Sequence, residues 1–302
     1  MKAETINNEK AIDTLKVIIA NGGPLENDYS DLEMSLATLA LADPRDGELA
    51  LKMAPLISSC GFLFDKVSLM GHIRTKPYGY AGDFEIIERI YQNEILREDY
   101  RLWDTYSLKH PAAQAVRNRK KYFKTLLSSK LVQRSSLTLL DIASGPARDL
   151  FEVYQDLNYG KHLLSTCVEM DNKAIEYATL LTAPFSDKIT FINKNIFRFS
   201  TTEQYDLVWS AGLFDYFDDK AFVRLLKGFG KWVNPGGEIV IGNFNDEYNP
   251  SRVFMELFGE WHLNHRSEHD LIGLALEAGY LNEQISVGRE PENINLFLHI
   301  RC

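Results

Sequence analysis

The amino-acid sequence predicts an α/β protein: a mainly parallel sheet with helices on both faces, preceded by a helical domain. Three observations support this fold class. After residue 130, short β-rich runs alternate with helical patterns, which is typical of parallel sheets. Before residue 130, apolar residues recur with a helical period and strand-like alternation is scarce. The first β-rich run ends in an acid and several small residues, the pattern of a close strand-to-helix turn.

Residues 1–130 are predicted to form the helical domain. Its helices are indicated by apolar residues three or four positions apart, at Leu32, Leu36, Leu39, Ile86, Ile87, Ile90 and Ile95. Glycine and proline at 21–24 and 42–47 interrupt the helical pattern. A helix from about 112 to 131 is expected to join this domain to the sheet.

Residues 131–302 are predicted to form the sheet domain. Its expected strands lie in the runs 139–142, 163–169, 189–197, 205–210, 234–241, 284–287 and 294–300. Its expected helices are 149–157, 173–181, 220–233 and 268–278. Ser267 and Asp270 have the spacing of a capping box, and Gly279 stands where a helix C-terminus favours glycine.

The turn after the first strand is the most informative segment. Asp141 closes the strand, and Ala143, Ser144, Gly145 and Ala147 supply small residues before the next helix. Small residues let a ligand approach the backbone, and the free N–H groups of a helix start attract an anionic group. Only one of these residues is glycine, so the G-x-G-x-x-G dinucleotide fingerprint is absent. About two dozen residues later, Glu169 stands where a ribose-binding acid is expected.

These residues resemble the class I S-adenosylmethionine-dependent methyltransferases over roughly residues 131–302. The matching positions are Asp141 to Ala147, Glu169, Asn195, Asp206-Leu207-Val208 and Pro235-Gly236-Gly237. The resemblance implies a Rossmann-like sheet whose last strand is antiparallel, with S-adenosyl-L-methionine as the cofactor. Ala143 and Ala147 replace family glycines, and Asn195 stands where aspartate is frequent. Alanine permits a close approach where its φ stays negative.

On this resemblance, the cofactor-binding residues are expected to be Tyr78, Arg119, Asp141, Ala143, Ser144, Gly145, Pro146, Glu169, Met170, Asn195, Ile196, Ser210, Ala211 and Gly212.

Composition narrows the class of protein and its partners. A chain of 302 residues with 45% hydrophobic content can bury an ordinary core. Cys60, Cys167 and Cys302 show no paired or metal-ligand spacing, which favours a reducing, cytoplasmic location. The polar N-terminus does not resemble a signal peptide, and no apolar run is long enough to span a membrane. The formal net charge of −9 argues against a nucleic-acid partner.

A local basic cluster and the histidines allow alternative interpretations. Arg117, Arg119, Lys120, Lys121 and Lys124 form either a solvated helix face, the favoured interpretation, or an anion-binding patch. The histidines lack the spacing of metal ligands, so no metal site is expected.

Two segments are unusual enough to suggest contacts with cofactor or substrate. Residues 72–85 place Tyr78 and Tyr80 among Pro77, Gly79 and Gly82. They form either a connector whose tyrosines pack on the core or a lid whose aromatic faces lie near the sulfonium. Residues 242–267 follow the fifth strand, at the sheet edge where ligands bind in open α/β sheets. Expected substrate-binding residues are Tyr216, Asn243, Trp261 and His262.

Segments 76–83, 210–216 and 242–244, with Trp261 and Arg266, resemble a narrower group: bacterial proteins named for biosynthesis of the extracellular factor 3-hydroxypalmitic acid methyl ester. The resemblance implies methylation of the carboxylate of a hydroxy fatty acid or another small acid. An ionised carboxylate needs no general base, so His265, Arg266 or Tyr80 would position it. A phenol or amine acceptor would need a base, such as His265 or His262.

Two other classes stay open at this stage. One is an N-, phenol O- or C-methyltransferase of a secondary metabolite. The other is a cofactor-binding regulatory protein without turnover.

Overall fold

The computed structural model describes residues 2–41, 47–157 and 162–302 of the chain. The chain forms two compact units. The helical unit comprises Met1–Ala113 and Pro250–His262, and the sheet unit comprises Gln114–Asn249 and Leu263–Cys302. The predicted helix breaker at 42–47 lies almost entirely outside the described residues.

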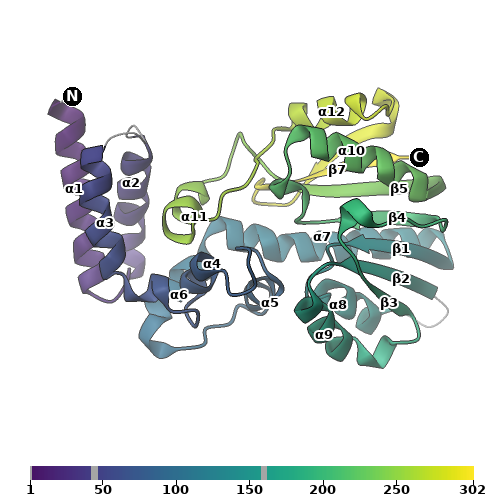
Figure 1. The fold of residues 1–302 in the computed structure, drawn as a ribbon, viewed down its shortest axis with the longest axis horizontal. Helices are drawn as coiled ribbons and strands as arrows, with labels where there is room; N and C mark the ends of the chain where they lie inside the picture. The colour runs from purple at the N-terminus through teal and green to yellow at the C-terminus, as the bar shows by residue number, and fades with distance from the viewer. Residues whose placement is uncertain (1, 42–46, 158–161) are drawn as a thin grey trace. The chain divides into compact units, whose positions relative to one another are not determined.

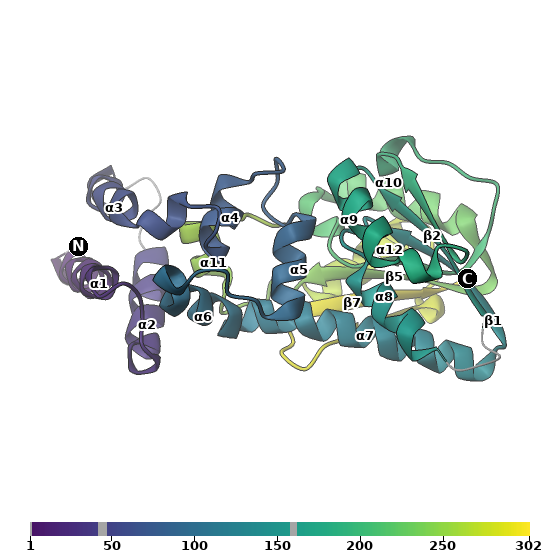
Figure 2. The ribbon, with the colours of Figure 1, turned by 90° about the horizontal axis from the view of Figure 1, so that it is seen from below.

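Seven helices carry the helical unit in the described part of the chain (Figures 1 and 2). They are α1 (Lys2–Ala20), α2 (Tyr29–Ala40), α3 (Gly47–Ser59), α4 (Leu69–Thr75), α5 (Phe84–Gln92), α6 (Arg101–Lys109) and α11 (Arg252–Gly259). As the apolar spacing predicted, Leu32, Leu36 and Leu39 of α2 are buried.

The segment 250–262 joins the helical unit although it lies far along the chain. Ser251 Oγ accepts a hydrogen bond from the backbone N–H of Ala112 at 2.8 Å and pairs with the His110 ring. The guanidinium of Arg74 donates to the Phe258 carbonyl oxygen at 3.0 Å. The Phe254 ring packs edge-on against Tyr106. These polar and aromatic contacts fix α11 to the N-terminal helices.

The sheet unit is built on seven strands in the order β3-β2-β1-β4-β5-β7-β6. The strands are β1 (Ser136–Ile142), β2 (His162–Glu169), β3 (Ile189–Asn193), β4 (Tyr205–Ser210), β5 (Val233–Phe244), β6 (Ile285–Arg289) and β7 (Asn295–Arg301). Strands β1 to β5 pair in parallel, and β7 runs antiparallel to both β5 and β6. The predicted fold class, including the antiparallel last strand, is confirmed.

Helices cover both faces of this sheet, as Figure 1 shows. They are α7 (Pro111–Gln133, in this unit from Gln114), α8 (Arg148–Asp156), α9 (Asn172–Leu181), α10 (Asp219–Phe229) and α12 (Glu268–Glu277). One apolar core joins α7 and α8 to the sheet, through residues such as Phe123 and Leu150. The other core joins α10 and α12 to the opposite face, through Phe222 and Leu271. Each face therefore buries its own hydrophobic layer.

Several predicted boundaries are confirmed and two are corrected. The capping box of Ser267 and Asp270 starts α12, and Gly279 follows its end with a φ of 100°. The predicted helix 220–233 ends early, at Phe229, and β5 already begins at Val233. The predicted strand 189–197 ends at Asn193, because the Asn195 side chain accepts a hydrogen bond from the Phe197 N–H and starts a 3-10 turn.

The basic cluster of α7 is paired in part within the protein, whereas Lys121 is exposed as a solvated helix face would have it. Lys120 and Lys124 form ion pairs with Glu152 of α8 at 2.5 and 3.1 Å, and Arg119 is buried. Lys120 and Lys124 therefore help to hold α7 against α8.

A second polar contact ties α7 to the sheet. Glu238 of β5 pairs with Lys130 of α7 and with His299 of β7. Burial alone would raise the pKa of Glu238, but hydrogen bonds from His299 and Lys130 outweigh it and lower the pKa from 4.5 to about 2. Because this pKa is depressed on folding, its contribution to stability is present above about pH 4.5 and is lost as pH falls towards 2.

We expect Glu238→Gln to lower the free energy of unfolding by about 1–2 kcal/mol near neutral pH, where solvent screens part of the pairing. The difference from the unsubstituted protein should shrink as the pH is lowered from about 4.5 towards 2. Urea unfolding curves of both proteins at several pH values measure this. An equal difference at every pH would contradict the assignment.

Two further expectations from the sequence concern the cysteines and membrane-spanning segments. Cys60, Cys167 and Cys302 are free thiols, and the first two are buried. In the part of the chain that the structure describes, no helix is both long and apolar enough to cross a membrane.

Candidate cofactor site

The predicted cofactor residues of the sheet unit gather at the carboxyl ends of its parallel strands. The chain leaves β1 towards β2 and β3 on one side and later adds β4 on the other side. Ligands of open α/β sheets bind at such a switch point. Asp141 and the following turn, Glu169 at the end of β2 and Ser210 at the end of β4 all lie on this edge.

The turn between β1 and α8 has a strained backbone. Ala143, Gly145 and Ala147 all have positive φ angles, of 57°, 53° and 51°. The condition of negative φ, under which alanine permits a close approach, is therefore not met at these two alanines. A left-handed alanine costs about 1–2 kcal/mol, which explains why related turns prefer glycine there. The Ala143 N–H still donates to the Val168 carbonyl at 2.8 Å, and Ala147 is fully buried. The surrounding contacts thus hold the turn in shape.

Glu169 connects the end of β2 to this turn. One carboxylate oxygen accepts a hydrogen bond from the Gly145 N–H at 3.0 Å. The other accepts from the N–H groups of Met170 and Asp171 at 2.7 and 3.0 Å. Burial raises the pKa of Glu169 against the opposing effect of these N–H donors. The acid is therefore buried and oriented beside the small-residue turn.

Asp141 carries a buried polar atom without a partner. Its Oδ2 is buried and makes no hydrogen bond within the described chain, and neither does Ser144 Oγ. Burial raises the pKa of Asp141 well above its usual range, and the nearby Asp149 and Glu169 raise it further. A buried, unpaired acceptor among other acids is costly unless a donor or a positive group approaches it. The site therefore suits a ligand that carries a cationic N–H donor.

Asp149 was missed by the sequence analysis, which placed it in the first turn of a helix. It is buried, and burial raises its pKa to about 6, against a hydrogen bond from the Leu150 N–H and the charge of Arg119. Its spacing from Asp141 alone does not reveal that both acids flank one turn.

Arg119 reaches this edge from α7. Its guanidinium donates to the Ala211 carbonyl oxygen at 3.1 Å, just beyond β4. A Cβ on Gly212 would lie 2.8 Å from the same guanidinium, so a larger residue there would displace the end of the Arg119 side chain. The Ser210 hydroxyl donates to the Ile142 carbonyl at 3.1 Å and ties β4 to β1. Four of the predicted cofactor residues thus meet across two strands and a helix.

The predicted adenine side is formed by residues after β2 and β3. The Asn195 amide lies 3.7 Å from the Met170 sulfur, and its oxygen caps the following 3-10 turn. Met170 is 60% exposed, whereas Ile196 is buried. An exposed thioether beside an amide offers a flat contact surface for an aromatic ring.

Arg266 has a different role from the one that the sequence suggested. Its guanidinium donates to Asp219 through Nε and Nη2, to Asn243 and the Phe214 carbonyl through Nη1, and to the Phe217 carbonyl through Nη2. These contacts occupy all five N–H donors of the side chain. Arg266 is buried, with its guanidinium 4.7 Å from the Phe222 ring centroid. The prediction that it positions an acceptor is therefore corrected: Arg266 holds together the segments around β4 and β5.

Asn243 belongs to the same structural network. It is fully buried, and its amide donates to the carbonyl oxygens of Phe244 and Asn264 at 3.0 Å. Its oxygen accepts from Arg266 at 2.9 Å. The expected contact of Asn243 with substrate is thus replaced by contacts within the protein. Asp215, a second residue that sequence reasoning missed, is buried in this region and accepts from the Phe244 N–H at 2.7 Å.

His265 has both ring nitrogens engaged. Nδ1 lies 3.1 Å from the Leu263 carbonyl, which can only accept, so Nδ1 carries the proton. Nε2 then accepts from the Asn249 amide at 3.0 Å. Tyr216, another predicted substrate residue of this unit, is 38% exposed.

The four other predicted site residues, Tyr78, Tyr80, Trp261 and His262, belong to the helical unit. The Tyr78 hydroxyl donates to Glu85 at 2.9 Å, and its ring packs against Phe84. Trp261 is buried and His262 is exposed. Within 72–85, the His72 ring pairs with the buried Asp83 at 2.8 Å. The loop is thus closely held within its own unit.

A family model described as a methyltransferase domain matches residues 133–284, about half of the chain. The chain therefore belongs to this methyltransferase family. It is a class I methyltransferase enzyme, and S-adenosyl-L-methionine is its cofactor. A comparison with curated proteins found no match.

Solved structures share the fold at low sequence identity. A crystal structure described as a possible exported protein from Bordetella parapertussis has a TM-score of 0.63 and 18% identity, covering 99% of this chain and 96% of that one. Magnesium protoporphyrin IX methyltransferase from Synechocystis PCC 6803, with bound S-adenosylhomocysteine, has a TM-score of 0.54 and 11% identity. That alignment covers 78% of this chain and 100% of the other.

Proposed function

We propose that this enzyme methylates the carboxylate of a small organic acid, most specifically a hydroxy fatty acid. S-adenosylmethionine supplies an activated methyl group. The carboxylate oxygen forms a bond to the methyl carbon as the carbon–sulfur bond breaks, and the electron pair of that bond stays on sulfur. No proton moves in this step, so the protein has to orient and desolvate the reactants.

The proposed cofactor contacts come from residues at the carboxyl ends of the parallel strands. Glu169 would accept hydrogen bonds from the ribose hydroxyls, and the unpaired Oδ2 of Asp141 fits the ammonium of the methionine part. Arg119 would pair with the methionine carboxylate, and Met170 and Asn195 would flank the adenine. The buried, unpaired oxygen of Asp141 is the observation that supports this arrangement best, because an ammonium neutralises it.

The bonding of His265 removes one of the two candidate bases for a phenol or amine acceptor and so supports a carboxylate acceptor. A general base needs a ring nitrogen that can take a proton from the acceptor. Both nitrogens of His265 instead bond to Leu263 and Asn249. An acceptor that is already ionised at neutral pH avoids this requirement.

The helical unit is the proposed substrate domain, in the role expected for residues 1–130. Tyr80, Trp261 and His262 belong to this unit and remain proposed acceptor contacts. Tyr216 of the sheet unit stays a separate prediction. Arg266 and Asn243 are excluded from this role by their bonding. We also place the enzyme in the cytoplasm, where its three free thiols would stay reduced.

The test is incubation of the purified protein with S-adenosylmethionine that carries a deuterated methyl group. A 3-hydroxy fatty acid, the same fatty acid without the hydroxyl, a phenol and an aliphatic amine are offered separately. We expect a labelled methyl ester with the hydroxy acid and a smaller yield with the plain acid, measured by mass spectrometry. Label found only on the phenol or the amine would overturn the proposal.

A further inference from the structure

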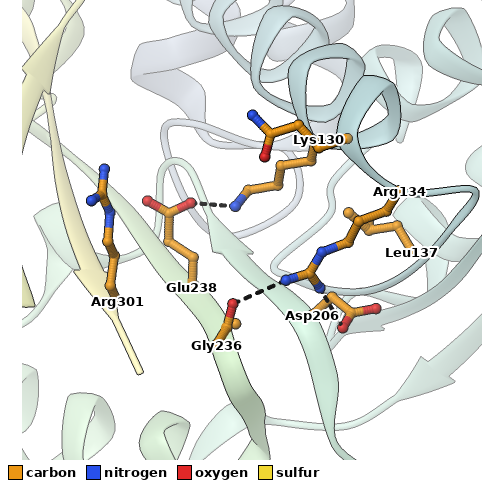
Figure 3. Close-up of a pocket in the computed structure, with 9 residues that line it drawn as sticks. Lys130, Arg134, Leu137, Asp206, Gly236, Glu238 and Arg301 are labelled. Carbon is orange, nitrogen blue, oxygen red and sulfur yellow. Dashed lines mark hydrogen bonds and ion pairs between the residues drawn. The ribbon is translucent and has the colours of Figure 1, made fainter.

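A pocket lies away from the cofactor residues, between α7 and the side of the sheet formed by the amino-terminal ends of β4 and β5 with β6 and β7 (Figure 3). It consists of an open groove of about 610 Å³ and a smaller cavity of about 230 Å³. The two share Lys130, Gln133, Glu238 and Arg301, and together they are called the α7 groove here. None of the predicted cofactor residues lines it.

A chain of hydrogen bonds forms one wall of the α7 groove. Tyr122 Oη lies 2.6 Å from His299 Nε2, and His299 Nδ1 lies 2.7 Å from Glu238 Oε1. Glu238 Oε2 in turn pairs with Lys130 Nζ at 2.5 Å. Since an ionised carboxylate only accepts, Nδ1 donates to Glu238, and Nε2 shares the second hydrogen bond with the Tyr122 hydroxyl. The wall is therefore ordered and its carboxylate is already satisfied.

The close packing of Tyr122 shows that this wall is a defined structure. Its ring stacks on Phe297 with centroids 3.9 Å apart. A Cβ on Gly288 would lie 2.2 Å from Tyr122 Oη, so β6 can pass the tyrosine only with glycine at this position.

The charges in the α7 groove leave a positive excess. Three cations line it, Lys130, Arg134 and Arg301, against two acids, Glu238 and Asp206. Glu238 is paired with Lys130, and Asp206 with Arg134 at 3.0 Å. Arg301 stands beside Glu238 across the β5–β7 register. Within the described residues, its guanidinium makes neither a hydrogen bond nor an ion pair.

The hydrogen-bonding groups that remain are mainly donors. Arg301 keeps five N–H groups, and Lys130 uses one of three for Glu238. The exposed hydroxyl of Ser286 also lines the groove, while Leu126 and Val287 add apolar surface. Hydrogen-bond donors around a cation without a paired acid are the groups that bind an oxyanion. A guanidinium can hydrogen-bond to a carboxylate or to a phosphate.

We propose that the α7 groove is a second ligand site, which binds a small organic anion through Arg301, with Lys130 and Ser286 as further donors. The anionic group is a carboxylate or a phosphate. This site is independent of the methyl-transfer site at the other edge of the sheet.

The experiment is an NMR titration of the full-length protein at neutral pH, with the ring resonances of His299 as the reporter. Inorganic phosphate and propionate are added separately, and chloride at matched ionic strength corrects for salt. We expect a saturable shift with at least one probe. A response to phosphate alone identifies a phosphate ligand, and a response to propionate alone identifies a carboxylate. A linear drift no larger than that with chloride would overturn the proposal.

Two variants distinguish binding at the α7 groove from a general effect of the protein's charge. Arg301→Gln should weaken the response about 10-fold or more, as expected for loss of a charge-assisted contact. Arg224→Gln removes an exposed arginine of α10 and should leave the response unchanged. Equal affinity in the two variants would also overturn the proposal. Circular dichroism spectra confirm that both variants fold, and Arg301→Lys should restore part of the affinity because it restores the charge.

Discussion

Replacing Glu169 by glutamine is expected to weaken binding of S-adenosylmethionine about 100-fold, the scale of losing two charge-assisted hydrogen bonds. The carboxylate already accepts three backbone N–H groups around the turn. An amide has a single acceptor oxygen, so its NH2 group would face either the Gly145 N–H or a ribose hydroxyl. The affinity is measured by isothermal titration calorimetry.

Glu176→Gln is the matched control for this change. Glu176 lies on the next helix, α9, and among the described residues it pairs with the exposed Lys173 alone. Its substitution should leave the affinity unchanged. If Glu169→Gln folded normally and bound the cofactor as tightly as the control, the ribose contact assigned to Glu169 would be wrong.

Replacing Arg266 by alanine should lower the free energy of unfolding by about 2–4 kcal/mol, as expected when buried hydrogen-bond acceptors lose their donor. The change leaves the Asn243 oxygen and the Phe214 carbonyl without their donor in a buried region. It also removes the cation packed on the Phe222 ring. Urea unfolding measures the effect.

Arg224→Ala provides the comparison, since Arg224 is exposed on α10 and its loss should change stability by no more than about 0.5 kcal/mol. If the Arg266→Ala protein were fully stable and had lost only methyl transfer, the structural role would be wrong and Arg266 would be assigned again to positioning the acceptor. The Arg266→Lys variant should recover little of the lost stability, because one ammonium group cannot replace a planar guanidinium with five N–H donors.

The elements that the sequence predicted well are those with a local physical signal. Alternating β-rich and helical runs predicted the parallel sheet, and Ser267 with Asp270 predicted the start of α12. The turn after β1 was located from Asp141 and its small residues. Its positive φ angles at two alanines were not foreseen, because alanine usually avoids this conformation and only the surrounding contacts impose it.

The roles that the sequence assigned wrongly depend on distant contacts. Arg266 and Asn243 are residue types that often bind substrate, but their partners come from segments up to 52 positions away. The membership of Pro250–His262 in the helical unit depends on contacts with His110 and Arg74. Buried Asp149 and Asp215 are likewise ordinary surface residue types in the sequence, and only the folded chain shows their burial.

Each compact unit keeps one buried free thiol, Cys60 in the helical unit and Cys167 in the sheet unit. Burial raises the pKa of both thiols, to about 11 for Cys60, so little of the reactive thiolate forms at neutral pH. An alkylating reagent therefore modifies either cysteine only when its surroundings open. The two labelling rates consequently record the local unfolding of each unit separately, without any engineered probe.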